Sequence, residues 1–379
     1  MRPLSNLAAR TNSVASGSAR VTCGRPYVYS GREAMRAIWR YGHSLEELEL
    51  DSGDDLPLGR IRGVRTCASD RGTFGILALD HRQNLRNLLR PSDPASVTYE
   101  DMVNFKRAVV LALGPIATGV LLDPEIGAAP CVADGTLKVG CGLIVAIEAT
   151  GYQGSSTARV SRVLDGWSVA KAKRMGASAA KLLVYYNPDA SNAAEQEQLV
   201  ARVAAECATF DLPLFIEPLS FSVGPGTAKP TGAARRRVVV ETARRLTALG
   251  GDVLKAEFPC DTPVTNVEEW RESCEELDSA SQLPWVLLSG GIDDATFEAQ
   301  VAVACQAGAS GVAVGRSVWA DAAELSPGQR DSFLLTTGVT RLRRLIKIVD
   351  ELGVPWDARP SPLRDARCPD EGWYRRYAE

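Results

Sequence analysis

Short apolar segments alternate with longer amphipathic stretches from about residue 73 onward. Such alternation is typical of parallel α/β folds, because each short segment reads as a buried strand and each stretch between them as a covering helix. The candidate strands are FGILALD (74–80), GVLLD (119–123), GLIVAIE (142–148), AKLLVYY (180–186), LPLFIEP (212–218), DVLKAEFP (252–259), PWVLLSG (284–290) and GVAVGR (311–316).

Helical patterns separate most of these strands, for example LDGWSVAKAKRMGA and AEQEQLVARVAAECATF. The connection between the second and third strands is the exception and shows little helical pattern. Eight strands spread over about 240 residues predict an α/β protein with a (β/α)8 TIM barrel. A doubly wound sheet is the competing fold. It would normally carry a GxGxxG turn after its first strand, and the sequence has none there.

The barrel does not account for the ends of the chain. We expect residues 1–55 to be a partly disordered N-terminal extension, residues 56–350 the barrel and residues 351–379 a C-terminal tail. A short helix is predicted over residues 31–50. The first 26 residues contain four arginines and no acid, which suits either a flexible tail or an organelle transit peptide.

Composition excludes several classes of partner. The chain is 45% apolar and 23% charged with a net charge of −3, so nothing favours nucleic acid or an anionic membrane surface. No apolar run approaches the roughly 18 residues of a membrane span. The nine cysteines form no CxxC pair, which favours free thiols in a reducing compartment such as the cytoplasm. With only two histidines, His43 and His81, a His-rich metal site is not expected.

Two of the eight lysines lie inside apolar strands, Lys255 in DVLKAEFP and Lys181 in AAKLLVYY. Burial of an ammonium group is costly, so strands rarely contain one without a reason. Desolvation and a neighbouring cation both lower a lysine pKa and free the amine to attack a carbonyl. The two lysines therefore indicate imine (Schiff-base) catalysis.

Polar residues occur at the ends of seven of the eight predicted strands. In a barrel, strand ends meet at one face, where active sites form. These residues are Asp80, Asp123, Glu148, Glu217, Lys255, Ser289 and Arg316.

The carboxylates among them have alternative interpretations. Glu217 is a candidate proton donor and acceptor or a structural partner of Lys181 or Arg316. Lys181 in turn is either a second catalytic cation or a structural partner of Glu217 or Glu148. Asp80 orients a hydroxyl or the reactive amine, or it caps the next loop. For Asp123 and Glu148 we expect hydrogen bonds at the barrel mouth. A cysteine nucleophile is disfavoured because so few histidines are available as a base.

The last two strands end in the glycine-containing sequences LSGGID and AVGRS. Loops after these strands commonly bind phosphate in barrels. Gly290, Gly291 and Gly315 permit close approach of the backbone, and Arg316 offers a bidentate guanidinium. Tight turns alone would also explain the glycines. We expect a phosphorylated small molecule as substrate.

Longer stretches are similar to a known family. LALDHR, LLDPEIG, IEATGYQGSST, LDGWSVAKAKRMGASAAKLLVYYNPD, PLFIEPLSF, DVLKAEFP, LPWVLLSGGI and SGVAVGRSVWA resemble the class I tagatose 1,6-bisphosphate aldolase family over about residues 60–345. The segment around the last two strands also resembles related 6-deoxy-6-sulfofructose 1-phosphate aldolases.

This resemblance implies a (β/α)8 barrel and an aldolase that needs neither metal nor cofactor. It assigns the Schiff-base role to Lys255 in VLKAE and acid–base catalysis to Glu217 in FIEP, with Lys181 and Asp80 as further active-site residues. The phosphate of the dihydroxyacetone half would be bound by Ser289, Gly290, Gly291, Gly315 and Arg316.

The sequence departs from this family at the mouth of the site. Where the tagatose enzymes have DQR and EKTGY, this chain has His81 before Arg82, and Ala149. The resemblance makes Arg82 a candidate for the second phosphate, and His81 would line the same pocket. Both departures leave recognition of the distal end of the sugar open.

We therefore expect reversible cleavage of a ketohexose bisphosphate, D-tagatose 1,6-bisphosphate above others, to dihydroxyacetone phosphate and glyceraldehyde 3-phosphate. The alternatives are a sulfonated sugar phosphate as substrate, a non-catalytic sugar-phosphate-binding regulator, and a metal-dependent aldolase. The sequence leaves the oligomeric state open, with a homo-oligomer as the default for such an enzyme.

Overall fold

The computed structural model covers the predicted barrel and part of the C-terminal segment. The described residues are 56–224, 228–261, 266–361, 363–366, 369, 371–375 and 377. The extension expected over residues 1–55, with its predicted helix at 31–50, lies outside the described residues.

Eight parallel strands form a closed barrel in the order β1-β2-β3-β6-β7-β8-β9-β10, with β10 pairing back to β1. The predicted TIM barrel is thus confirmed, and the doubly wound alternative is wrong. The strands are β1 (Phe74–Leu79), β2 (Gly119–Leu122), β3 (Gly142–Ala146), β6 (Ala179–Tyr186), β7 (Leu214–Ser220), β8 (Val253–Ala256), β9 (Trp285–Leu288) and β10 (Gly311–Val314).

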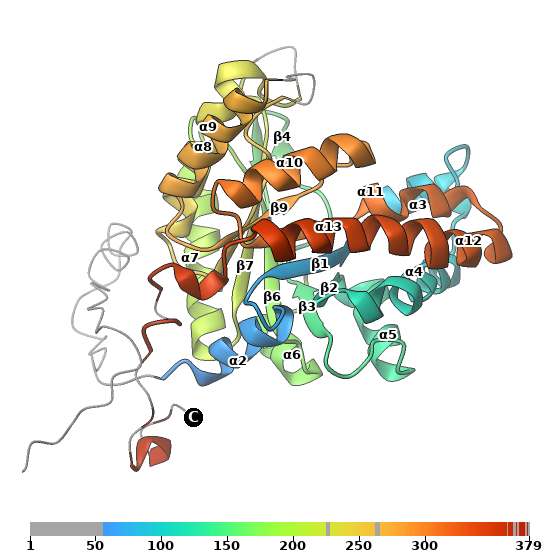
Figure 1. The fold of residues 1–379 in the computed structure, drawn as a ribbon, viewed down its shortest axis with the longest axis horizontal. Helices are drawn as coiled ribbons and strands as arrows, with labels where there is room; N and C mark the ends of the chain where they lie inside the picture. The colour runs from blue at the N-terminus through green and yellow to red at the C-terminus, as the bar shows by residue number, and fades with distance from the viewer. Residues whose placement is uncertain are drawn as a thin grey trace, which may run out of the picture.

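Helices surround this barrel (Figure 1). They are α2 (Leu58–Cys67), α3 (Gln83–Leu89), α4 (Tyr99–Leu113), α5 (Ala129–Ala133), α6 (Val169–Met175), α7 (Ala193–Thr209), α8 (Gly232–Thr247), α9 (Val267–Ala280), α10 (Asp294–Gln306), α11 (Arg316–Trp319), α12 (Pro327–Phe333) and α13 (Val339–Leu352). Among the described residues, no helix is both long and apolar enough to span a membrane.

Local sequence explains where several helices begin and end. Thr98 and Asp101 form a capping box at the start of α4, each side chain accepting a hydrogen bond from the other residue's backbone N–H. The hydroxyl of Ser168 caps α6, which ends at Gly176 in the left-handed conformation with φ 94°.

The connections after β2 and β3 are more structured than the sequence indicates. A π-helical turn (Pro124–Ala128) and α5 follow β2. An antiparallel hairpin follows β3, made of β4 (Gln153–Ser155) and β5 (Ala158–Val160), and the periodicity gave no signal for it.

Apolar side chains fill the barrel interior up to the level of the site. This interior cluster contains Val64, Cys67, Phe74, Ile76, Ala78, Leu121, Ile144, Ala179, Phe215, Val253, Val286, Ala313, Trp356 and Leu363. Val64 and Cys67 come from α2, and Trp356 and Leu363 follow α13, so they close the amino-terminal end of the barrel. Polar residues remain at the carboxyl end.

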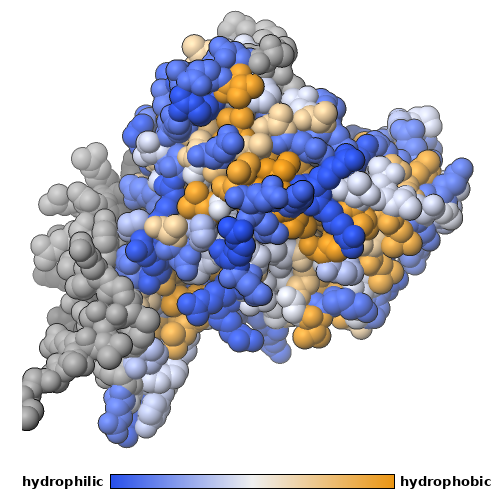
Figure 2. Space-filling model, in the orientation of Figure 1, coloured by the Kyte–Doolittle hydropathy of each residue, from blue (hydrophilic) through white to orange (hydrophobic). Residues whose placement is uncertain are grey.

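On the face drawn in Figure 2, polar and apolar groups are not segregated to different parts of the outer surface. Polar groups, coloured blue, cover much of it, with apolar groups between them. Scattered apolar groups of this kind are normal for a protein surface.

Candidate active site

Strand alternation directs the two lysines and Glu217 into the barrel. Side chains two residues apart in a strand point to the same face. Ala179, Phe215 and Val253 belong to the interior cluster. Lys181, Glu217 and Lys255, each two residues later, therefore share the interior one layer nearer the carboxyl end.

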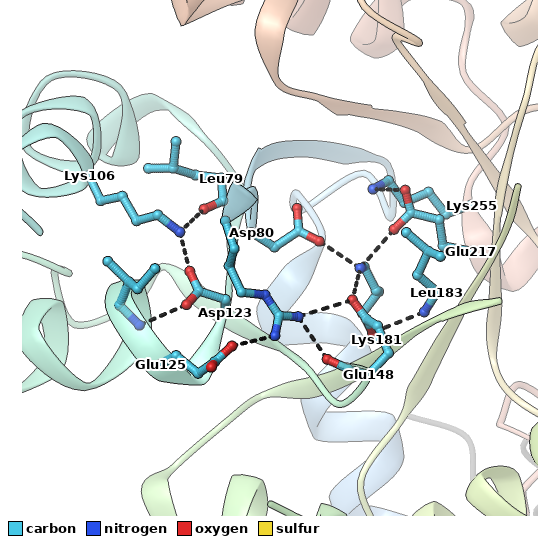
Figure 3. Close-up of polar contacts among 12 residues, drawn as sticks. Leu79, Asp80, Lys106, Asp123, Glu125, Glu148, Lys181, Leu183, Glu217 and Lys255 are labelled. Atoms are coloured by element: carbon cyan, nitrogen blue, oxygen red, sulfur yellow. Dashed lines mark hydrogen bonds and ion pairs between the residues drawn. The ribbon is translucent and has the colours of Figure 1, made fainter. Parts of the chain in front are cut away.

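Glu217 bridges the two lysines (Figure 3). Its Oε1 accepts a hydrogen bond from Lys255 Nζ at 2.7 Å, and its Oε2 lies 3.0 Å from Lys181 Nζ. Lys181 Nζ also contacts Asp80 Oδ2 and Glu148 Oε1, both at 2.6 Å. We call these five side chains the ionic cluster.

Lys181 is the permanent cation of the ionic cluster. Its side chain is fully buried. Burial opposes the charged form, but Asp80, Glu148 and Glu217 outweigh it, so the pKa of Lys181 is raised well above its usual value. Lys181 thus contacts three carboxylates, two of which, Glu148 and Glu217, are the partners considered in the sequence analysis.

Asp80 remains an anion in this setting. Burial raises the pKa of its carboxyl group, but the charges of Lys181 and Lys255 lower it by more, so the pKa lies well below its usual value. Its side chain keeps 12% exposure, enough to reach a ligand at the barrel mouth. Asp80 can therefore accept a hydrogen bond from a bound hydroxyl.

Arg82 lies beside Glu148, just outside the ionic cluster. Glu148 Oε2 accepts from the backbone N–H of Leu183 at 3.0 Å. Arg82 donates to Glu125 Oε2 at 2.5 Å and to the backbone carbonyl of Glu148 at 2.7 Å. The side chain of Arg82, a candidate for binding the second phosphate, is thus buried and already paired.

His81 points away from Arg82. Its ring packs edge-on against Trp319, with ring centroids 5.2 Å apart, and its Cε1 lies 3.2 Å from where a Cβ on Gly315 would be. Burial lowers the pKa of His81 to about 4, and Arg316 adds to the effect although Asp80 opposes it. The structure thus separates His81 and Arg82, which the sequence analysis assigned to one pocket.

The predicted phosphate-binding residues do come together. Strands β9 and β10 are neighbours, and Arg316 Nη2 donates to the carbonyl of Gly290 at 3.3 Å. A Cβ on Gly291 would lie 2.9 Å from Arg316 Cζ, so only glycine leaves room for this guanidinium. Ser289 is buried beside them. Burial lowers the pKa of Arg316, which makes an anion a favourable partner.

Comparison with known proteins identifies the family. The model of the "DeoC/LacD family aldolase" matches residues 74–321, well over half of the chain. The chain belongs to the DeoC/LacD aldolase family. It is accordingly an aldolase, a carbon–carbon lyase.

Two curated relatives of this aldolase are both named as tagatose 1,6-diphosphate aldolases. A tagatose 1,6-diphosphate aldolase 2 from Streptococcus agalactiae is 30% identical over 77% of this chain and 95% of its own length. A tagatose 1,6-diphosphate aldolase from Listeria monocytogenes is 30% identical over 81% of this chain and 96% of its own length.

A solved structure of a Schiff base-forming fructose-1,6-bisphosphate aldolase shares the fold. It aligns with a TM-score of 0.51 and 23% identity over 76% of this chain and 99% of that chain.

A third buried lysine of the aldolase, Lys106, escaped the sequence analysis. Its ammonium group pairs with Asp123 and donates to the carbonyl of Leu79 at 2.9 Å. Asp123 Oδ2 also accepts from the backbone N–H of Ile126 at 2.7 Å. The hydrogen-bonding role expected of Asp123 is confirmed. Helical spacing offered a signal, because Met102 and Val110 lie four residues either side of Lys106 on the buried face of α4.

The thiols of the aldolase are poor nucleophiles. All seven cysteines among the described residues are free. Burial raises the pKa of Cys131 and of Cys141 to about 11. Their thiols therefore stay protonated, and only the thiolate is a good nucleophile. Within the described part of the chain, no group of three or more His, Cys, Asp or Glu side chains is arranged to hold a metal ion.

Proposed function

We propose that this aldolase works through a Schiff base on Lys255 and reversibly cleaves a ketohexose bisphosphate, D-tagatose 1,6-bisphosphate above others. The products are dihydroxyacetone phosphate and glyceraldehyde 3-phosphate. The observation that carries the proposal is the contact of 2.7 Å between Lys255 Nζ and Glu217 Oε1 beside the permanent cation Lys181. The two tagatose-diphosphate aldolases, each 30% identical over most of the chain, support the choice of sugar.

Activation of Lys255 requires the loss of one proton. Glu217 accepts it along the existing hydrogen bond. The ammonium group of Lys181 contacts the other oxygen of Glu217 at 3.0 Å and so holds this carboxylate beside the amine. Neutral Lys255 then attacks the C2 ketone of the sugar and forms a carbinolamine. Glu217 returns the proton to the C2 hydroxyl, which leaves as water and gives the protonated imine.

Cleavage breaks the bond between C3 and C4. A carboxylate removes the proton of the C4 hydroxyl and the aldehyde forms. The electron pair of the broken bond becomes the C2=C3 double bond, and the π pair of the protonated imine moves to nitrogen, which gives an enamine. Glu217 is better situated for this step than Asp80, because it contacts the reacting nitrogen directly. Asp80 accepts a hydrogen bond from a sugar hydroxyl. Protonation of the enamine and addition of water to the imine release dihydroxyacetone phosphate.

The phosphate of the dihydroxyacetone half binds between the loops after β9 and β10. Ser289, Gly290, Gly291 and Gly315 supply backbone N–H donors and room, and Arg316 supplies the charge. His81 lies against Gly315 at the same side of the mouth. Its neutral ring contributes hydrogen bonding rather than charge, since its pKa is lowered to about 4.

Product analysis tests this proposal. Purified protein is incubated with D-tagatose 1,6-bisphosphate in the presence of a chelator, and triose phosphates are measured by coupled dehydrogenase assays. We expect equimolar dihydroxyacetone phosphate and glyceraldehyde 3-phosphate, with Lys255→Met inactive. Turnover that survives in Lys255→Met, or that is abolished by the chelator, would refute the Schiff-base assignment.

A further inference from the structure

Arg159, in β5 of the hairpin after β3, is held by three aromatic rings. Its guanidinium carbon lies 4.6 Å from the ring centre of Tyr152, 5.5 Å from that of Tyr185 and 5.2 Å from that of Phe221. Tyr152 and Tyr185 pack edge to face, with ring centres 5.1 Å apart. Such a cradle fixes the orientation of a guanidinium and favours its charge through cation–π attraction.

This cation has no anionic partner among the described residues. Arg159 Nε donates to the carbonyl of Ser156 at 3.1 Å, and Nη2 donates to that of Ala228 at 3.4 Å. Since an arginine has five N–H donors, the remaining ones are free for a ligand. Arg82 is by contrast paired with Glu125, and Arg162 in the same segment with Asp165. An ordered, unpaired guanidinium at the mouth of an active site requires an explanation.

Strand geometry connects Arg159 to the ionic cluster. Tyr185 follows Lys181 by four residues in β6, so both side chains point into the barrel. Tyr185 lies about 13 Å further along the strand, toward the mouth, at about 3.3 Å per residue. Burial raises the pKa of Tyr185, with Arg159 opposing and Glu217 adding to the effect. Arg159 and its three aromatic neighbours therefore lie on the mouth side of the reacting groups.

The order of the strands places Arg316 and Arg159 on opposite sides of the barrel mouth. Arg316 follows β10, and the cradle rests on the end of β6. Three strands separate β10 from β6 in either direction around the closed ring, so these two positions lie opposite each other. Lys255 is in β8, midway between them. A substrate bound to Lys255 can thus extend toward one arginine at each end.

From this arrangement we infer that Arg159 binds the anionic group on the far end of the sugar, the C6 phosphate that leaves with the aldehyde product. The inference rests on the proposed function and deepens it by naming the distal anion site. Phosphate and sulfonate share the tetrahedral oxyanion chemistry that a guanidinium recognises. Arg159, rather than Arg82, is then the residue that binds the second phosphate, because Glu125 and Glu148 already neutralise Arg82.

The condensation reaction tests the inference, because only the aldehyde carries the distal anion. Initial rates are measured for dihydroxyacetone phosphate with glyceraldehyde 3-phosphate, and separately with unphosphorylated D-glyceraldehyde. We expect Arg159→Gln to raise KM for glyceraldehyde 3-phosphate by about 10- to 100-fold, the usual effect of losing a charged hydrogen-bonding partner. KM for dihydroxyacetone phosphate and the rate with D-glyceraldehyde should stay within about twofold of wild type.

Arg162→Gln is the matched control, because Arg162 lies three residues away, is 42% exposed and has its own acid. It should leave every rate unchanged. Arg159→Lys should recover part of the affinity, because it restores charge without the planar fork. An aldehyde with a sulfonate in place of the phosphate forms the second arm: a larger loss for the sulfonate would identify that anion as the ligand.

The outcomes are distinguishable. If the wild type condenses both aldehydes and Arg159→Gln leaves their ratio unchanged, or lowers both rates equally, Arg159 has no role in anion recognition and the inference is overturned. If the wild type forms no condensation product with any of the aldehydes, the proposed function itself has failed. A selective loss for the charged aldehydes supports the inference.

Discussion

At the scale of single residues, the ionic cluster contains two ammonium groups and three carboxylates, an excess of one negative charge. A proton moved from Lys255 to Glu217 stays inside the cluster, so activation of the amine changes no net charge in the buried site. Lys181 keeps its own proton because three carboxylates contact it. Removal of Lys181 would leave Asp80 without its ion pair to an ammonium group. Glu148 and Glu217 would keep only Arg82 and Lys255 as ion-pair partners among the described residues. Loss of such a buried cation is far more costly than loss of a surface ion pair.

Lys181→Met should therefore lower the free energy of unfolding by about 3 to 5 kcal/mol. Chemical denaturation at pH 8 measures it. The control is Lys347→Met, because Lys347 is 75% exposed and forms a surface ion pair with Glu351 at 3.8 Å; its effect should stay below about 0.5 kcal/mol. Equal stability of the two variants would contradict a structural role for the Lys181 charge.

His81 makes stability depend on pH in a specific window. Burial lowers its native pKa to about 4 from the usual 6.5, so between these values the unfolded chain binds the proton and the native state does not. Stability therefore rises with pH across the window and falls as pH drops from 6.5 toward 4, by about 2 to 3 kcal/mol in total. Urea unfolding at several pH values should show a shallower pH dependence in His81→Gln. An unchanged slope would mean that His81 titrates normally.

The two strand lysines could be predicted from the sequence because each interrupts an apolar run. Lys106 could not be recognised as easily, since an amphipathic helix normally carries lysines and only its position relative to Met102 and Val110 indicates burial. The separation of His81 from Arg82 was also beyond sequence reasoning. Consecutive residues just beyond a strand point to different sides, and side-chain partners, here Trp319 and Glu125, decide which.

At the scale of elements, the conformation of the loop after β9 and its contact with Arg316 require glycine at particular positions. Gly290 and Gly291 both have positive φ, at 60° and 82°, so alanine strains the backbone at either position. They differ in surroundings. A Cβ on Gly290 meets nothing within 4 Å, whereas one on Gly291 meets the guanidinium of Arg316.

This pair of glycines provides an internal comparison. Gly291→Ala should displace Arg316 and raise KM for dihydroxyacetone phosphate about tenfold, equivalent to about 1.4 kcal/mol. Gly290→Ala should have the smaller effect, because it adds backbone strain alone. Steady-state condensation kinetics with both variants checks the difference. Equal effects would show that Arg316 does not hold the phosphate.

The number and order of the barrel strands followed from the alternation of apolar segments, whereas the hairpin of β4 and β5 did not. Its strands have three residues each, those of β4 are exposed and those of β5 only partly buried, so no apolar period marks them. The cradle of Arg159 was hidden for the same reason. Its three rings come from separate segments, and only the fold brings Tyr152, Tyr185 and Phe221 together.

At the scale of the whole molecule, the two ends of the barrel have different roles, one catalytic and one structural. The carboxyl end carries the chemistry, and the amino end is closed by α2 and by the segment after α13. Trp356 is 4% exposed, and its backbone N–H donates to the carbonyl of Gly72 at 2.9 Å. Part of the predicted C-terminal tail is thus packed against the barrel, which its sequence beyond α13 did not reveal.

Trp356→Ala should lower the free energy of unfolding by about 3 to 5 kcal/mol, the usual cost of removing a buried aromatic side chain. Thermal and urea unfolding measure the loss, and kcat below the unfolding transition should be preserved because the site lies at the other end. Tyr374→Ala, at a position 62% exposed, is the control and should change stability by less than about 0.5 kcal/mol. Loss of kcat without loss of stability would contradict this division between the two ends.

Covalent trapping tests the central claim most directly. The protein is mixed with dihydroxyacetone phosphate, reduced with borohydride, digested and mapped by mass spectrometry. The account predicts one reduced adduct, on the peptide containing Lys255, and none in Lys255→Met. An adduct on Lys181 instead, or the absence of any adduct in protein that cleaves the sugar, would contradict it.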